Sequence, residues 1–316
     1  MRVSGFLLII FGAAALVAFL SGCAAWNAER NAPMLGERVS VNGAALHVLD
    51  IGPRDSAKPP VVLIHGASVN LRDMKIALGD ALSEDRRVIL IDRPGRGYSE
   101  RSKDGHRIAV QAQYIRDAVA ALEVENPVVV GQSFGGAVAL AYALQYQEEM
   151  AGLVLLAPVS HEWPGGVAWY NNASQIPVVG FFLRRLVIPA YGQFAAAGGV
   201  EESFAPDAAP ENYAERSGLA LLFRAHDFKA NAADLARLKP QIIDQQARYG
   251  ELGLPVAIMT GVNDTTVSPR IHSQALEREI ADATLTMLPD TGHALHHAEA
   301  EKILTVIDSI ARAGRS

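Results

Sequence analysis

The chain has 316 residues, of which half are hydrophobic and 20% are charged. This composition allows a large buried core and excludes general intrinsic disorder. A net charge of −6 and the lack of any basic run exclude an electrostatic nucleic-acid surface, so we expect no nucleic-acid partner. The single cysteine, Cys23, excludes an intramolecular disulfide and a cysteine-rich zinc site.

The N-terminal segment has the pattern of an export signal. After Arg2 the chain is uncharged as far as Asn27, and residues 6–20 form its apolar centre. This centre runs into the tetrapeptide L-S-G-C, which ends at Cys23 and resembles the bacterial lipobox, where a signal peptidase cuts before a cysteine that is then lipidated. The alternative is an uncleaved membrane anchor, because the uncharged stretch is long enough to span a bilayer.

Both interpretations predict the same topology and the same organisation of the chain. The only basic residue precedes the apolar run, so the N-terminus stays inside and the remainder is exported and tethered to the membrane, on the periplasmic side. The expected segments are a signal peptide or anchor at 1–22, a linker at 23–35, an α/β core at 36–160 and 250–316, and an insertion at 161–249.

Beyond the linker, short apolar runs alternate with segments of helical periodicity. Two alternating segments flank Asn42-Gly43, a dipeptide typical of a tight hairpin turn. Continuously apolar runs rich in β-branched residues then suit strands of a parallel sheet covered on both faces; they lie at 60–64, 88–91, 128–130 and 153–156. Helical spacing between them, as at 108–122 and 134–146, predicts an α/β fold with a mostly parallel central sheet.

The alternation stops after Pro158, and aromatic side chains gather between residues 161 and 249. It resumes with expected strands and helices at 256–259, 268–280, 284–288 and 298–313. The middle segment is therefore predicted to be a helical cap, inserted after the sixth strand of the core, whose aromatic side chains would line an apolar pocket.

A G-x-S-x-G motif at residues 131–135 lies between a predicted strand and a predicted helix. A nucleophile on such a turn needs small neighbours so that strand and helix approach closely, and Gly131 and Gly135 leave that room. The hydroxyl of Ser133 also needs a base and an acid that orients the base. Asp264 and His293 each follow a predicted strand, so the three side chains are expected to converge at one edge of the sheet.

This order of motifs resembles the α/β-hydrolase superfamily, in its capped, epoxide-hydrolase-like form but with a serine nucleophile. Residues 65–68 (HGAS) are similar to the oxyanion-hole turn of the family, and residues 92–99 (DRPGRGYS) to its D-x-x-G-x-G-x-S loop. The resemblance covers residues 36–314 and implies the α/β-hydrolase fold. The site residues that it implies are the nucleophile Ser133, the base and acid His293, its orienting partner Asp264, and the backbone N–H groups of Ala67 and Phe134 as oxyanion donors.

Other residues compete for these roles. Glu162 is the rival acid, because some relatives carry the acid after the preceding strand. We expect His296 and His297 at the surface and His65 to shape the oxyanion turn through hydrogen bonds. The loop at 92–99 is expected to be structural, with its own acidic and basic residues paired locally.

Serine at the elbow departs from the relatives that resemble haloalkane dehalogenases and epoxide hydrolases, which use aspartate there. The sequence therefore predicts acyl transfer by a carboxylesterase, with a small apolar ester and water as reactants and neither a metal nor an organic cofactor. Hydrolysis of a C–C bond, lactonase activity and perhydrolysis remain open, as does a catalytically silent, membrane-tethered binding protein. The oligomeric state also stays open.

Overall fold

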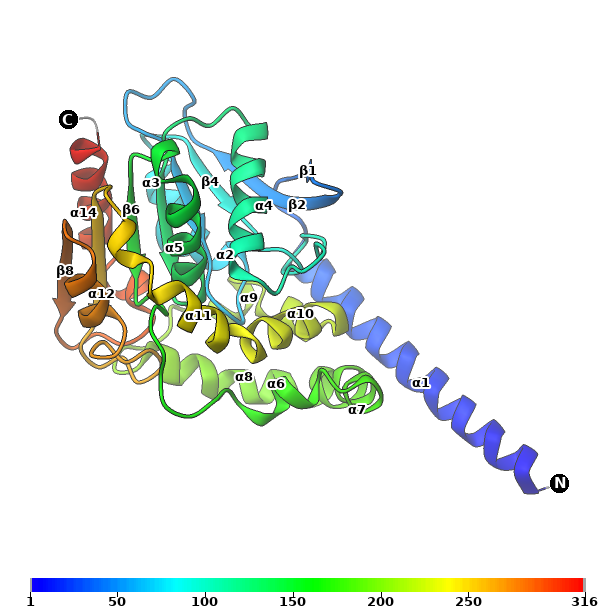
Figure 1. Cartoon of the computed structure of the whole chain (residues 1–316). Helices are drawn as coiled ribbons and strands as arrows, with labels where there is room; N and C mark the ends of the chain where they lie inside the picture. Colours follow the sequence, from blue (N-terminus) through cyan, green and yellow to red (C-terminus); the bar gives the residue numbers. More distant parts are fainter. Residues whose placement is uncertain (1, 315–316) are drawn as a thin grey trace.

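The computed structural model describes residues 2–314, apart from the side chains of residues 2–11, 13, 14, 190, 193 and 194. A long helix, α1 (Arg2–Asn31), leads into a body in which helices cover both faces of one eight-stranded sheet (Figure 1). The strand order is β1-β2-β4-β3-β5-β6-β7-β8. The strands are β1 (Glu37–Val41), β2 (Ala44–Ile51), β3 (Val61–Ile64), β4 (Val88–Ile91), β5 (Val128–Gln132), β6 (Gly152–Leu156), β7 (Val256–Gly261) and β8 (Ala283–Leu288).

The sheet is parallel from β4 to β8, and its other edge is the predicted hairpin. β1 and β2 pair antiparallel, as do β2 and β4. Asn42 and Gly43 join β1 to β2 with φ angles of 48° and 81°, the left-handed conformations that a two-residue hairpin turn requires. The expected mostly parallel sheet of an α/β-hydrolase fold is thereby confirmed.

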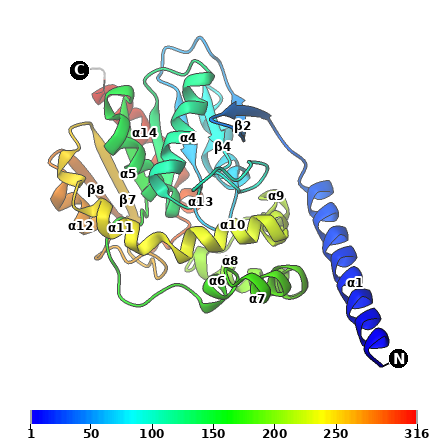
Figure 2. The same cartoon turned by 45° about the vertical axis from the view of Figure 1, so that its right-hand side comes forward.

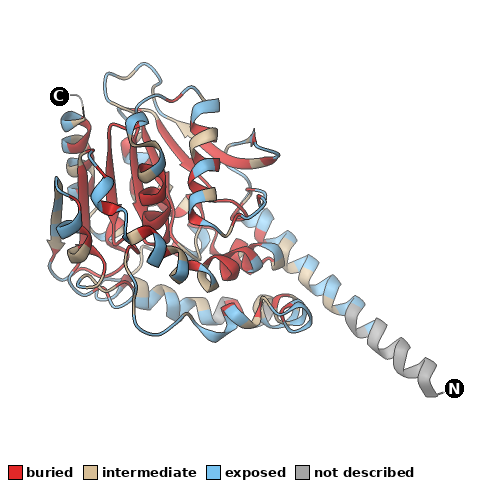
Figure 3. Ribbon diagram, viewed as in Figure 1, coloured by how far each residue is buried: buried red, intermediate tan, exposed pale blue. Residues whose placement is uncertain are grey.

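Both faces of the parallel strands are buried, as their unbroken apolar sequences predict (Figure 3). On one face Val62 and Val129 pack with α4 (Ile108–Ala121), α5 (Phe134–Tyr146) and α12 (Ser273–Glu279). On the other face Val61 and Val128 join the cluster that includes residues of α14 (Ala300–Ala313) and of the segment after β3. That segment consists of α2 (Leu71–Met74), η1 (Lys75–Gly79) and α3 (Asp80–Leu82), while η2 (Gln147–Glu149), η5 (Tyr249–Glu251) and α13 (Leu295–Ala298) are short connecting turns.

A run of helices between β6 and β7 lies across the carboxyl edge of the sheet (Figures 1 and 2). We call this run the cap. Its elements are α6 (Trp169–Ala173), α7 (Pro177–Phe182), η3 (Leu183–Val187), α8 (Ile188–Phe204), α9 (Tyr213–Arg216), η4 (Leu219–Phe223), α10 (Ala225–Ala236) and α11 (Leu238–Gln246). Two buried clusters, centred on Phe223 and on Phe204, pack within and beneath it.

Buried ion pairs fasten cap helix α10 to the core. The guanidinium of Arg93 lies 3.0 Å from the carboxylate of Asp234, and that of Arg96 lies 2.8 Å from Asp227. All four side chains are at most 1% exposed. The local pairing expected for the loop at 92–99 is therefore wrong, because both arginines find their carboxylates on α10.

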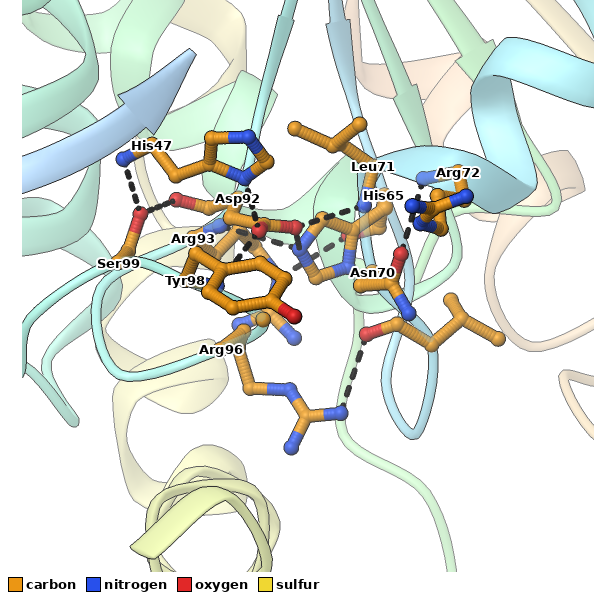
Figure 4. Close-up of polar contacts among 12 residues, drawn as sticks. His47, His65, Asn70, Leu71, Arg72, Asp92, Arg93, Arg96, Tyr98 and Ser99 are labelled. Carbon is orange, nitrogen blue, oxygen red and sulfur yellow. Dashed lines mark hydrogen bonds and ion pairs between the residues drawn. The ribbon is translucent and has the colours of Figure 1, made fainter. Parts of the chain in front are cut away.

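The remaining charged residue of that loop, Asp92, is held by the core (Figure 4). One carboxylate oxygen accepts from His47 Nδ1 at 2.6 Å and from the amide of Tyr98 at 2.8 Å. The other oxygen accepts from the amide of Leu71 at 2.8 Å. Asp92 thus joins β2, the start of α2 and its own loop, which gives the loop a fixed shape.

The segment expected as a linker is helical as far as Asn31. Ala28 and Ala32 are buried against Leu221 of η4, because their small side chains allow close approach. Glu29 adds an ion pair of 2.9 Å to Arg224. Cys23 is exposed on α1. In the part of the chain that the structure describes, no helix has both the length and the apolarity needed to cross a membrane.

We expect Asp234→Ala to lower the free energy of unfolding by roughly 3–5 kcal/mol, because it leaves the guanidinium of Arg93 buried without its carboxylate. Denaturation in urea, followed by circular dichroism, measures the loss. The exposed Asp55 supplies the control, since Asp55→Ala should change the free energy of unfolding by no more than about 0.5 kcal/mol. Equal stability of the two variants would contradict the role assigned to the α10 ion pairs.

Candidate active site

Ser133 occupies a strained turn between β5 and α5. Its φ and ψ are 53° and −116°, a combination that non-glycine residues rarely adopt. The strain persists because the turn is tied down: the amide of Ser133 donates to the Leu156 carbonyl at 2.9 Å. A Cβ on Gly131 would lie 2.4 Å from the carbonyl oxygen of Gly135, and one on Gly135 would lie 2.3 Å from that of Ile64. Glycine at both positions therefore allows α5 to pass this close to the sheet.

Asp264 and His293 form a buried pair on the loops after β7 and β8. Asp264 Oδ2 lies 2.7 Å from His293 Nδ1. Asp264 Oδ1 accepts from the amides of Thr266 and Val267, both at 2.8 Å, so the carboxylate is fixed in place. Because a carboxylate accepts, His293 Nδ1 carries the hydrogen and Nε2 is left as the basic nitrogen. The side-chain amide of Gln132 lies 3.4 Å from that Nε2.

Ser133 and His293 line one cavity of about 820 Å³ between the core and the cap. Most of its wall is apolar and comes from the cap, including Leu183, Val187, Ile188, Leu219, Leu222, Phe223 and Phe228. No lysine or arginine is among the described residues that line it. Of the three residues predicted from the sequence, Ser133 and His293 thus line the cavity, and the carboxylate of Asp264 binds His293.

Of the two residues whose backbone N–H groups are predicted as oxyanion donors, Phe134 directly follows Ser133, and Ala67 lines the same cavity as Ser133. Phe134 is also the first residue of α5, a position whose N–H has no partner within the helix. Arg93 supports both. Its Nε and one terminal nitrogen donate to the carbonyls of His65 and Gly66, each at 3.0 Å, and its guanidinium carbon lies 4.3 Å from the centre of the Phe134 ring. Burial lowers the pKa of Arg93 to about 10, so the group stays charged at neutral pH.

His65 has the hydrogen-bonding role expected of it (Figure 4). Its Nδ1 donates to the Gly66 carbonyl at 2.8 Å, and its Nε2 accepts from the amide of Arg93 at 3.0 Å. Burial, together with the neighbouring charge of Arg93, lowers the pKa of His65 to about 3. The ring is therefore neutral, and both of its nitrogens are already used, so His65 is not available as a base.

The rival acid Glu162 does not approach the base. Its side chain is 56% exposed and lies 4.0 Å from Lys239 of α11. Of the two candidate acids, Asp264 is the one that contacts His293 in the part of the chain that the structure describes.

The expected surface position of His296 and His297 is wrong. Their side chains are only 5% and 4% exposed and bind the two carboxylate oxygens of Asp73, at 2.9 and 2.8 Å. The hydroxyl of Tyr213 donates to the same carboxylate at 2.7 Å. Burial opposes ionisation of Asp73, but the two histidines hold its pKa well below the ordinary value. Sequence reasoning missed this cluster because Asp73 precedes His296 by 223 residues.

Asp73, His296 and His297 are also close enough together to hold a metal ion, since their ligand atoms lie within 4.8 Å of one another. Each imidazole, however, is hydrogen-bonded through Nε2 to one oxygen of Asp73. A metal would have to replace both hydrogen bonds. Asp73 and His296 lie on the cavity wall, so the cluster adds polar groups to a mostly apolar lining.

Comparison with known proteins supports the fold. Residues 59–182 match the family model for the alpha/beta hydrolase fold. The chain is 34% identical over 149 residues to the 2-hydroxymuconate semialdehyde hydrolase of Pseudomonas sp. (strain CF600), an alignment that covers 44% of this chain and 48% of that protein. It therefore spans about half the length of the first curated relatives that it matches.

Solved structures match this chain over a larger share of its length than the curated relatives do. The esterase from Exiguobacterium antarcticum superposes with a TM-score of 0.70 at 23% identity, over 88% of this chain and 100% of that one. The enol-lactonase from Burkholderia xenovorans LB400 gives a TM-score of 0.69 at 20% identity, over 87% and 99% of the two chains. Together with the family-model match and the strand order, these likenesses show that the chain has the α/β-hydrolase fold.

Proposed function

We propose that this chain is a serine hydrolase that cleaves carboxylic esters with apolar acyl groups. The observation that carries the proposal is the 2.7 Å contact between Asp264 and His293. His293 and Ser133 line the same cavity. A serine hydroxyl becomes a nucleophile only beside an oriented base, and the bond from His293 to Asp264 supports His293 in that role.

The reaction follows from the roles of these groups. His293 Nε2 takes the proton of Ser133 as the hydroxyl oxygen attacks the ester carbonyl. The amides of Ala67 and Phe134 donate to the resulting oxyanion, and each such donor contributes roughly 3 kcal/mol to stabilisation of the transition state. The protonated imidazole then gives its proton to the departing alkoxide. Water, activated by the same nitrogen, releases the acid from Ser133 and restores the free enzyme.

The charge of the cavity favours a neutral substrate. Its described lining includes Asp73 and Glu202 but no lysine or arginine. The substrate named for the Pseudomonas relative, a muconate semialdehyde, is a carboxylate at neutral pH, and binding it in an apolar cavity without a cation is costly. Neutral esters avoid that cost. Lactones, which are cyclic esters, form a second candidate class, because an enol-lactonase is among the structural neighbours.

We also propose that the protein is exported and that its N-terminus tethers it to a membrane, with the catalytic domain outside the cytoplasm on the periplasmic side. The support is the apolar run at 6–20 behind Arg2 and the lipobox-like tetrapeptide that ends at Cys23. Lipidation at Cys23 and a simple helical anchor are the two forms of this tether.

A panel of p-nitrophenyl esters of increasing acyl length tests the substrate class. We expect kcat/KM to rise with acyl chain length by up to about fourfold per methylene. This factor corresponds to the free energy of about 0.8 kcal/mol that burial of one methylene contributes. Ser133→Ala should lower kcat by about 10⁴- to 10⁶-fold and prevent labelling by a fluorophosphonate. A wild-type protein that the fluorophosphonate does not label would refute the hydrolase, and higher kcat/KM on a dienoate C–C substrate would refute the ester preference.

Asp264→Asn should lower kcat on the order of 10⁴-fold, because an amide can hold the imidazole in the wrong tautomer. The matched variant Glu162→Gln makes the same chemical change at the exposed rival acid, and its kcat should stay close to wild type. Steady-state kinetics on the best ester decides between the two acids. The assignment is wrong if Glu162→Gln loses activity and Asp264→Asn keeps it.

Cys23→Ser tests the form of the tether. If Cys23 is lipidated, the variant should keep its signal segment or leave the membrane fraction, which mass spectrometry and fractionation of bacterial cells detect. An unchanged mature mass with unchanged membrane association would instead identify the plain anchor. Recovery of the wild-type protein entirely in the soluble cytoplasmic fraction would refute both forms.

A further inference from the structure

Exposed large apolar side chains concentrate on one part of the cap. We call this surface the cap face, and it spans α6, α7, η3 and the beginning of α8. Its exposed members are Trp169, Tyr170, Ile176, Val178, Val179, Phe181, Phe182, Leu186, Val187 and Tyr191. Trp169 and Val178 are 73% and 68% exposed. Figure 3 shows these cap helices largely in the colour of exposed residues. A soluble monomer rarely leaves so many large apolar groups together in water, so such a face indicates a binding surface.

The composition around the cap face suits a lipid surface. Residues 163–200 contain no aspartate, glutamate or lysine, and their only charged residues are Arg184 and Arg185. Tryptophan and tyrosine at the rim of an apolar surface prefer the boundary between lipid and water. Arg184 is buried and donates to the Ser174 carbonyl, so Arg185, which is half-buried over the ring of Phe181, is the arginine that an anionic headgroup can attract. The cap face thus combines apolar and aromatic side chains with one accessible basic group and no acidic one, as an interfacial membrane-binding surface does.

Helix α1 supplies an independent reason to name a bilayer. It contacts η3, and in both views it leaves the body on the side where α7 lies (Figures 1 and 2). Leu16, Phe19, Leu20 and Trp26 are exposed along it. Whether the chain is tethered by a lipid at Cys23 or by the apolar run at 6–20, the tether brings the cap face close to the membrane.

The cap face is continuous with the wall of the cavity. Trp169, Tyr170, Val187 and Tyr191 belong to both. A bilayer against the cap face would therefore lie beside the apolar route toward Ser133. An ester dissolved in the membrane could pass to the cavity along these side chains without exposing its acyl chain to water.

We propose that the cap face docks on the surface of a lipid bilayer and that ester substrates reach Ser133 from the lipid phase. The docking is independent of the chemistry at Ser133. The delivery of substrate rests on the proposed function, so the two halves need separate experiments.

Site-specific fluorescence tests the docking in the full chain. Cys23→Ser removes the one native thiol, and Val178→Cys on the cap face is then labelled with the environment-sensitive dye NBD. The matched control is Glu125→Cys, an exposed position just before β5 and therefore at the opposite end of the strands from the cap. Because α1 carries both labelled proteins to a vesicle equally, the comparison isolates the orientation of the body.

With vesicles of phosphatidylcholine and phosphatidylglycerol at 3:1, we expect the emission at position 178 to shift to shorter wavelength and to be quenched by doxyl-labelled lipid, while emission at position 125 stays unchanged. No shift at 178, or equal shifts at both positions, would overturn the docking. A shift in lipid-free solution that accompanies a dimer mass in light scattering would also overturn it and assign the cap face to a second copy of the chain.

Kinetics tests the delivery. The double variant Val178→Asp/Val179→Asp adds two charges to the cap face at positions that do not line the cavity. We expect it to hydrolyse a long-chain ester dissolved in vesicles about tenfold more slowly, while its rate on dissolved p-nitrophenyl acetate stays within about twofold of wild type. Ile243→Asp, at an exposed apolar residue of α11, is the control and should leave both rates unchanged.

An undiminished rate on the vesicle ester would overturn the delivery. If the wild-type protein hydrolyses neither ester, the proposed function fails and the delivery fails with it, but the fluorescence at position 178 still decides the docking.

Discussion

The buried guanidinium of Arg93 is the interaction on which the site geometry depends most. It binds the two carbonyls of the oxyanion turn, stacks on Phe134 at the start of the elbow helix, and pairs with Asp234 of the cap. Three parts of the chain that are remote in sequence therefore meet at one cation. Removing an ion of this kind from water costs several kcal/mol, and only a full set of partners offsets that cost. The oxyanion turn, the elbow and α10 consequently form one unit.

This coupling divides the cap into two parts. Helix α10 is fixed to the core by the carboxylates of Asp227 and Asp234, which bind arginines of the loop after β4. The part formed by α6, α7 and η3 instead exposes many of its apolar side chains. Local stability follows burial, so we expect the second part to adjust more readily than α10 when a ligand enters the cavity. The fixed part then keeps the predicted oxyanion donors in place.

The sequence was sufficient to predict those features that depend on local pattern. Continuous apolar runs predicted the parallel strands, and Asn42-Gly43 predicted the hairpin. The G-x-S-x-G motif between a strand and a helix predicted the strained turn at Ser133. The approach of Asp264 to His293 followed from a rule of topology, since both residues come after neighbouring parallel strands. In each case the local residue pattern or the order of the strands restricts the chain to few conformations.

Charged residues were harder to place, because a charge does not reveal its partner in the sequence. Arg93 precedes Asp234 by 141 residues, and Asp73 precedes His296 by 223. Nothing local distinguishes a histidine that meets a buried carboxylate from one that meets water. The charges at the cavity follow from these distant pairings. The two arginines pair with the α10 carboxylates, and the carboxylate of Asp73 is stabilised by hydrogen bonds from two imidazoles and a phenol. No described cation is left to line the cavity, so the same ion pairs that hold the cap also favour an uncharged substrate.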